Sequence, residues 1–208
     1  RLKELGVKRV AFDVLFTGPS SDSAADQKLV DALASVPTVI GVQSSVRYVS
    51  NQGGGYFLED FDRPYEPFRK AAREALVGLQ DKGGIIRNFP GYRTDQEKNY
   101  PFISQAAAGL QTNATTAFPT SRDLIRYYGP GRTIPVLSYW EVLQQDLPLT
   151  RDLLKDSVVI IGLLLRSDTG GAQKDSYYSP FGPPMVFGVE VHATLVANLI
   201  ARDWIARP

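Results

Sequence analysis

The sequence predicts an α/β fold in which helices flank a mostly parallel central sheet, a three-layer α/β sandwich with a hairpin and irregular insertions. Two short apolar runs, Thr38-Val39-Ile40-Gly41-Val42 and Val158-Val159-Ile160-Ile161-Gly162, are typical of strands covered on both faces. A strand, a helix and a second strand follow one another at the start of the chain. This βαβ unit predicts parallel strands joined by a right-handed crossover.

The first of these strands is expected at residues 7–12, a short and mainly apolar segment. Ser23-Ala-Ala-Asp26 has the form of a capping box, and apolar residues at helical spacing continue the helix up to Pro37. Proline lacks the N–H that a helix interior needs, so the helix ends there. The strand at Thr38–Val42 follows.

The middle of the chain is less regular. We expect a flexible loop at Asn51–Gly55 and a helix at Pro64–Ala75, where alanine, arginine and lysine are frequent. Residues 75–79 and 84–88 flank the turn-like segment Gln80–Gly83, which predicts a hairpin.

Three further helices are expected. Pro101 begins one, and Ser138 with Glu141 forms a capping box at the start of another. The last helix runs from Gly188 to near Trp204 and is apolar almost all round, so we expect it to be buried on two sides. Either it lies centrally against the sheet, or part of its surface also contacts a second protomer.

Composition limits the classes of function. A chain of 208 residues with 43% hydrophobic residues is long enough to bury one sizeable core, so we expect a single domain over residues 1–208. The 23 basic and 22 acidic residues leave a net charge of +1 without a long basic run, which argues against a nucleic-acid partner. Cysteine is absent, which excludes disulfides and thiolate metal sites. No apolar run approaches the roughly 20 residues of a membrane helix.

Candidate ligand-binding residues lie near predicted strand ends and in the loop before the last helix, where open α/β sheets bind ligands. They are Asp13, Arg166, Asp168, Asp175, Tyr177, Glu190 and His192. The carboxylates are able to hold a divalent cation or to pair with Arg166 and Lys174, whereas ordinary salt-bridge and capping roles are the alternative. Because calcium-loop spacing and nucleotide-binding fingerprints are both absent from the sequence, we predict no metal site and no cofactor.

Three of these positions have competing interpretations. His192, the only histidine, lies in an apolar helix, which favours a core histidine over a ligand or a base. Tyr177–Phe181 is part of an aromatic, proline-stiffened loop that either walls a pocket or packs over the sheet edge. Asp13–Thr17 resembles the nucleophile loop of haloacid-dehalogenase-like phosphatases, but Leu15 replaces its acid–base aspartate. We therefore predict no catalytic residue.

Several motifs follow one another in a characteristic order. They are Phe12–Phe16, Asp26–Leu33, Val39–Gly41, Ile125–Pro130 with its Tyr-x-Gly end, Ile134–Leu143 with its Pro-x-x-Ser-Tyr core, Val159–Gly162, Asp175–Phe181 and Gly188–Ala193. Together they resemble the second CHASE family of extracellular sensory domains over nearly the whole chain. Asp156-Ser157 stands where that family usually has Gly-Lys, and the segment between Arg47 and Arg73 looks like an insertion.

The resemblance implies the sensory input domain of a bacterial receptor, periplasmic or on the extracellular face of the cytoplasmic membrane. It also implies that the chain is an excised fragment, with transmembrane helices outside it and a cytoplasmic cyclase, histidine kinase, other kinase or cyclic-dinucleotide enzyme as output. The expected partners are a small-molecule or ion ligand, or a periplasmic protein, with a homodimer in the full-length receptor. Signal transmission through adjoining membrane helices predicts that both chain ends lie on one face of the domain.

Two other functions remain open from the sequence. One is a soluble α/β hydrolase-like enzyme that uses carboxylates near Asp13 and Asp175. The other is an adhesion or assembly module, which would expose a large apolar patch and self-associate without a small ligand.

Overall fold

The computed structural model describes residues 1–51, 53–80, 83–110, 118–144, 148–164 and 175–207. The strands are β1 (Arg9–Phe12), β2 (Thr38–Asn51), β3 (Gly54–Asp62), β4 (Arg73–Leu76), β5 (Val158–Ile161), β6 (Ser176–Ser179) and β7 (Gly182–Phe187). The helices are α1 (Ser23–Ser35), α2 (Glu66–Ala71), α3 (Ile103–Ala108), α4 (Tyr139–Leu143), α5 (Pro148–Leu154) and α6 (Gly188–Ala201), with a 3₁₀ turn η1 (Glu97–Asn99).

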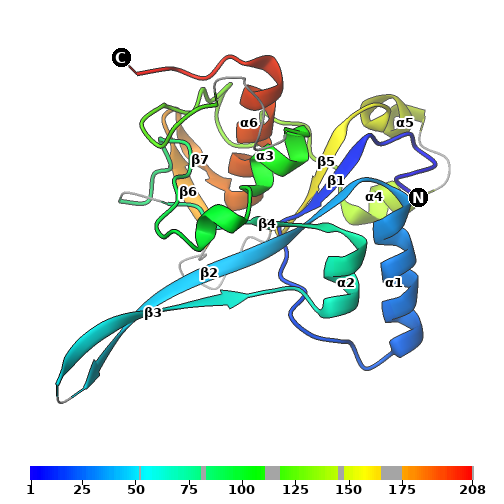
Figure 1. Ribbon diagram of the computed structural model, residues 1–208. Coiled ribbons are helices and arrows are strands. Elements are labelled where there is room, and N and C mark those ends of the chain that lie inside the picture. The colour runs from blue at the N-terminus through cyan, green and yellow to red at the C-terminus, as the bar shows by residue number, and fades with distance from the viewer. Residues whose placement is uncertain (52, 81–82, 111–117, 145–147, 165–174, 208) are drawn as a thin grey trace.

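A mostly parallel sheet lies at the centre of the molecule, which confirms the predicted fold class (Figure 1). β1 lies between β2 and β5, with Val10 aligned with Thr38 on one side and Val159 on the other. The first part of β2 also pairs in parallel with β4. Beyond the body, residues 43–51 of β2 pair with residues 54–62 of β3 in antiparallel fashion. These two segments form an arm that projects from the domain (Figure 1).

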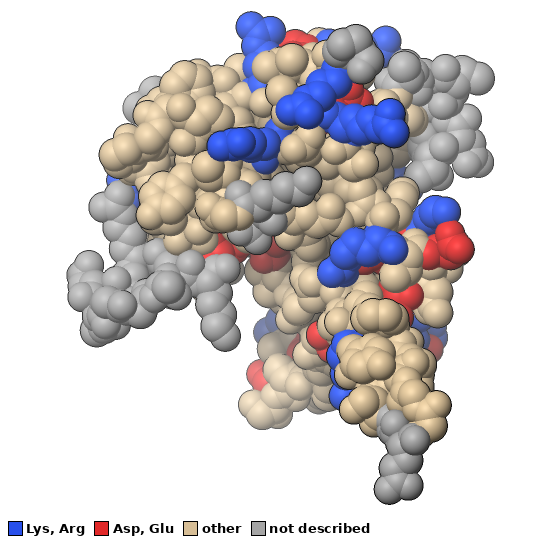
Figure 2. All heavy atoms as spheres, turned by 90° about the vertical axis from the view of Figure 1, so that its left-hand side faces the viewer, with Lys and Arg blue, Asp and Glu red and all other residues tan. Residues whose placement is uncertain are grey.

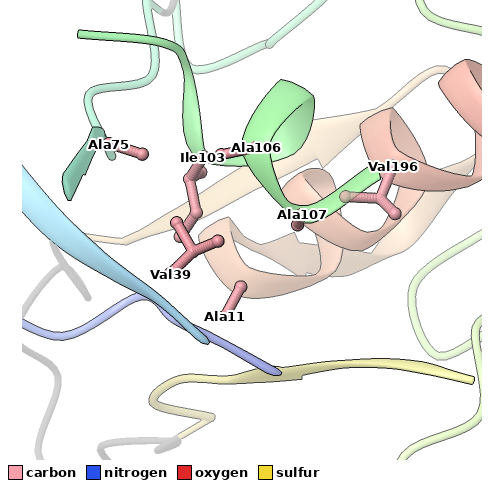
Figure 3. Close-up of a cluster of buried hydrophobic side chains, with 7 residues drawn as sticks. All are labelled: Ala11, Val39, Ala75, Ile103, Ala106, Ala107 and Val196. Carbon is pink, nitrogen blue, oxygen red and sulfur yellow. The ribbon is translucent and has the colours of Figure 1, made fainter. Parts of the chain in front are cut away.

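Alternate residues of β1 serve the two outer layers, because successive side chains of a strand point to opposite faces. Ala11 faces α3 and α6, and Figure 3 shows the cluster that fills this layer. Its members are Ala11, Val39, Ala75, Ile103, Ala106, Ala107 and Val196. Val10 faces the opposite layer, where it packs with Leu154 of α5 and Val36 after α1. Helices therefore cover both faces of the sheet.

Helix α6 is buried on almost every side, as its composition predicts. Val191 and Leu195 are 0% exposed. The polar side chains of this helix, Glu190, Thr194 and Asn198, are also buried, and each hydrogen-bonds with backbone groups. Asn198 accepts from Arg126 N at 2.8 Å and donates to Arg126 O at 2.9 Å. The helix ends at Ala201, a turn earlier than expected, so Trp204 lies beyond it.

The helix predicted at Pro64–Ala75 is present but shorter, and the hairpin predicted around Gln80–Gly83 is wrong. α2 ends at Ala71, and the residues that follow form β4 in the central sheet. Residues 84–88 do not pair with β4, since Ile85 bridges Tyr178 and Asn88 bridges Leu124. Local alanine-rich composition favours a helix, but burial between β2 and α3 determines the strand.

Two segments predicted as loops contain strand residues in the structure. Asn51 ends β2, and Gly54 and Gly55 begin β3. Most of the β2–β3 arm belongs to the segment between Arg47 and Arg73 that was expected to be an insertion. Tyr177–Phe181 lies in an antiparallel β6–β7 hairpin rather than an irregular loop. The start of α1 also differs by one residue, because Asp22, not Ser23, caps it through the N–H groups of residues 24 and 25.

The chain ends lie on opposite sides of the sheet, so the expectation that they share one face is wrong. Leu5 and Val7 pack with Val10 in the layer that contains α5. Trp204 instead packs with Phe89 on the α6 side, and Figure 1 shows the two ends far apart. Within the described residues, none of the helices combines the length and apolarity needed to cross a bilayer.

Candidate ligand-binding cavity

A cavity of about 340 Å³ opens at the carboxyl edge of the sheet, and this volume is within the range of small-molecule sites. Elements that are distant in the sequence meet there: the loop after β1, Gln43 in β2, the segment after β4, the start of β6 and the second turn of α6. Among the described residues its lining comprises Asp13, Val14, Leu15, Gln43, Val77, Gly78, Leu79, Asp175, Tyr177 and His192.

His192 closes the inner end of the cavity and is only 3% exposed. Its Nε2 lies 3.1 Å from the carbonyl oxygen of Val77. Burial lowers the pKa of His192 to about 4, so the ring is neutral at physiological pH. The carbonyl requires a donor, so Nε2 carries the proton and Nδ1 is left as an acceptor. Among the described residues, Nδ1 has no hydrogen-bond partner.

Asp13 stands directly after β1, beside the histidine. Its backbone N–H donates to Ile161 O at 2.8 Å, which fixes the residue at the end of the sheet. A carboxylate oxygen lies 3.8 Å from His192 Nε2, and the side chain is 13% exposed. Burial raises the pKa of Asp13 to about 6, because its charged form is poorly solvated there.

Asp175 brings a second carboxyl group to the cavity, at its rim. Gly188 N, at the start of α6, donates to Asp175 O at 3.0 Å. The Asp175 carboxylate lies so close to Gly188 that a Cβ at this position would collide with it. Desolvation and then repulsion from Asp13 raise the pKa of Asp175, while a hydrogen bond with the Tyr177 side chain lowers it. The start of α6 thus depends on a glycine that makes room for a carboxylate.

Apolar side chains contribute to the remaining walls. Val14 and Leu15 line one side and Val77 and Leu79 another. The amide of Gln43 also lines the cavity, but its Nε2 already donates to Ser44 O at 3.0 Å. The cavity therefore combines hydrocarbon walls with two carboxyl groups and one unpaired ring nitrogen.

Four of the seven candidate residues meet at this cavity, namely Asp13, Asp175, Tyr177 and His192. Glu190 does not line it. Its carboxylate accepts the backbone N–H groups of Phe187 and Arg132, so it caps α6 and holds a neighbouring loop. Arg166 and Asp168, together with Lys174, lie outside the described residues.

Sequence reasoning missed Gln43, Val77 and Leu79. Gln43 lies inside a long strand, and the other two follow β4, which was mistaken for part of a helix and hairpin. The carboxyl ends of parallel strands share one edge of a sheet, so residues that follow such strands are candidates for the site. This rule identifies Val77 and Leu79 only if β4 is first recognised as a strand.

The described residues offer no nucleophile placed against His192, whose Nε2 is occupied by a carbonyl. Within the same residues, no three His, Asp or Glu side chains are arranged to hold a metal ion. The side chains of the cavity offer hydrogen-bond acceptors: the carboxyl oxygens of Asp13 and Asp175 and Nδ1 of His192.

The fold and the cavity define an α/β domain with a small-molecule-sized site at the carboxyl edge of its sheet. The family model of the CHASE2 domain matches residues 1–208, so the chain belongs to the CHASE2 family. CHASE2 domains are extracellular sensory domains of signalling receptors and are not catalytic. No curated protein and no solved structure matches the chain.

Proposed function

We propose that this chain is the extracytoplasmic input domain of a bacterial transmembrane receptor and that its stimulus binds in the cavity beside His192. The family match over residues 1–208 is the observation that carries the sensory role. The output domain is a cytoplasmic cyclase, kinase or cyclic-dinucleotide enzyme. The periplasm, or the outer face of the cytoplasmic membrane, is the compartment in which the cavity meets its ligand.

The position of the cavity supports the second half of this proposal. Ligands of open α/β sheets bind beyond the carboxyl ends of the strands, which is where Asp13 and Val77 lie. A buried ring nitrogen without a partner also costs stability, and proteins retain such groups where they serve another purpose. His192 Nδ1 is that group here.

The cavity joins the two elements that lead to the opposite ends of the chain. Asp13 follows β1, which continues from the N-terminal segment, and His192 belongs to α6, which leads to the C-terminal segment. A ligand held between them shifts β1 relative to α6 if it binds two arrangements with different affinity. This mechanism needs no proximity between the chain ends, so it replaces transmission through one shared face.

The family assignment gives no support to the hydrolase-like alternative, because CHASE2 domains are sensory rather than catalytic. An observation does favour a protein contact in addition to the ligand site. Tyr48, Tyr56 and Phe57 are 60%, 53% and 73% exposed on the projecting arm. In Figure 2 mainly uncharged side chains cover the end of this arm.

We assign the arm to the contact between two copies in the receptor homodimer. An edge strand such as β3 is able to pair with a symmetry-related copy of itself, and aromatic side chains stabilise such contacts. Sedimentation of the chain and of the Phe57→Asp variant tests this assignment. Dimers that dissociate in the variant support it, and monomers of the unchanged chain at high concentration contradict it.

A ligand screen by thermal unfolding tests the cavity. The panel contains organic acids, amines, amino acids, sugars, nucleotides and divalent cations. At 100 times its dissociation constant a ligand adds about 2.7 kcal/mol, and each kcal/mol raises Tm by about 2–4 °C for a chain of this size.

Two glycine variants give the screen its control. A Cβ at Gly78 meets only Gln43 Nε2, at 3.5 Å, so Gly78→Leu places a side chain in the cavity without backbone strain. A Cβ at Gly18 meets nothing within 4 Å, so Gly18→Leu is the matched control. A stabilising ligand that is lost in Gly78→Leu and kept in Gly18→Leu supports the proposal. The proposal is contradicted if every ligand binds the unchanged chain and both variants equally, or if no compound of the panel binds.

A further inference from the structure

We infer that the cavity is selective for small organic cations, in which one ammonium group is attached to a short apolar body. This inference rests on the proposed function, since it names the class of ligand for the same cavity. It follows from three features of the lining: which polar atoms are free, what charge they carry, and what the remaining walls are made of.

Three side chains of the described lining offer hydrogen-bond acceptors. His192 Nδ1 has no partner, and it must accept because Nε2 donates to the carbonyl of Val77. The carboxyl oxygens of Asp13 and Asp175 are acceptors when ionised. One amide hydrogen of Gln43 is donated to Ser44 O, and the Tyr177 side chain hydrogen-bonds with Asp175. A ligand that donates hydrogen bonds complements the three acceptor side chains, and an ammonium group offers three donors.

The charged side chains among the described lining residues have one sign. Asp13 and Asp175 repel each other electrostatically, and no lysine or arginine is among the described lining residues. A cation between them offsets this repulsion, whereas a carboxylate or phosphate adds to it. Since no described trio of His, Asp and Glu is placed for a metal ion, the geometry favours an organic cation. The same charge disfavours amino acids, whose own carboxylate would enter the site.

The walls determine the rest of the ligand. Val14, Leu15 and Leu79 present hydrocarbon surface in a volume of about 340 Å³. Apolar surface that is removed from water contributes about 25 cal/mol per Å², so a short alkyl or aromatic body gains from contact with these side chains. Butylamine and phenethylamine have this combination of groups and are suitable probes.

The test compares these amines with isosteric molecules by isothermal titration calorimetry. n-Butanol keeps the shape of butylamine without its charge, and butanoate reverses the charge. We expect millimolar or tighter binding of both amines and at least about tenfold weaker binding of the alcohol and the acid, because a charged hydrogen bond to a desolvated carboxylate is worth that factor or more.

Variants identify the groups that recognise the amine. Asp13→Asn removes a cavity carboxylate and is expected to weaken amine binding by about tenfold or more. Asp31→Asn removes an exposed carboxylate on α1 and is expected to leave binding unchanged. Circular dichroism of both variants establishes that they are folded.

The outcomes separate this inference from the proposed function. Equal affinity for butanol or butanoate, undiminished binding by Asp13→Asn, or no binding of either amine overturns the inference. If another compound of the screen still binds in a Gly78-dependent manner, the cavity remains the stimulus site with a different ligand class. If no compound does, the cavity proposal fails as well.

Discussion

His192 and Asp13 lie side by side, with Nε2 3.8 Å from a carboxylate oxygen, yet they do not form a charged pair. Burial lowers the pKa of the histidine to about 4 and raises that of the aspartate to about 6. Between these two values both groups are neutral. Above about pH 6 Asp13 is ionised beside a neutral ring, so the cavity becomes anionic in the range where most bacteria live.

Asp13→Asn should make the chain more stable at pH 8. The folded state holds the Asp13 proton more tightly than the unfolded state, so the associated stability is present below about pH 3.8 and is lost as pH rises through about 6. At about 1.4 kcal/mol per pH unit, this loss reaches about 3 kcal/mol. Urea unfolding at pH 4 and pH 8 measures it. A difference between variant and unchanged chain that is the same at both pH values would contradict the buried carboxylate.

His192→Gln should remove the opposite dependence. The lowered pKa of His192 means that stability is complete above about pH 6.5 and is lost as pH falls through about 4, on the order of 3 kcal/mol. The variant should therefore gain stability relative to the unchanged chain at pH 4 and not at pH 8, where it loses some packing. Urea titrations at the two pH values again give the answer, and a uniform effect would sink the assignment of a neutral histidine.

Glu190→Ala should destabilise the domain more than the equivalent change at Glu141. Both glutamates occupy the third position of their helices and accept the N–H of the cap residue. Glu190 is 4% exposed and also accepts from Arg132 N, so its loss leaves two donors unpaired, at about 2–3 kcal/mol. Glu141 is exposed, and its loss should cost about 0.5–1 kcal/mol. Equal costs in chemical denaturation would contradict the role of Glu190.

Asn198→Leu should cost about 2–3 kcal/mol although leucine fits a buried helix. Asn198 is 0% exposed and binds both backbone groups of Arg126. Leucine would leave these groups buried without partners. Urea unfolding measures the loss. An effect below about 0.5 kcal/mol would show that the 126–128 segment does not depend on α6.

The parts of the fold that were predictable are those in which the local pattern and the tertiary environment agree. The apolar runs of β2 and β5 are strands because they are covered on both faces, and α6 is buried because its composition leaves no solvent face. The motif order likewise identified the family, which the match over residues 1–208 confirms.

The parts that failed are those in which distant contacts decide. β4 is a strand only because β2 and α3 enclose it, and its own alanine and arginine content points to a helix. The arm continues β2 beyond the body, where pairing with β3 stabilises it. Gln43 lies where these two environments meet, and for that reason no local pattern marked it as a cavity residue.

Only some of the residues that line the cavity could be predicted from the sequence. Asp13 follows β1, so the rule of the carboxyl edge found it, whereas Asp175 was selected as part of the loop before the last helix. The rule also selected Glu190, which instead binds backbone N–H groups, because sequence alone does not give the side of α6 on which a residue falls. His192, expected in the core, is both buried and part of the cavity wall.

The central claim is that a ligand enters the cavity and contacts the imidazole of His192. Since this is the only histidine of the chain, its ring nitrogens are resolved without ambiguity in a ¹⁵N NMR spectrum. At pH 7 we predict a neutral ring protonated at Nε2, and an Nδ1 resonance that moves during titration with butylamine in the unchanged chain and in Gly18→Leu but not in Gly78→Leu. A protonated ring at pH 7, or an Nδ1 resonance that stays fixed while a ligand saturates the protein, would contradict the account.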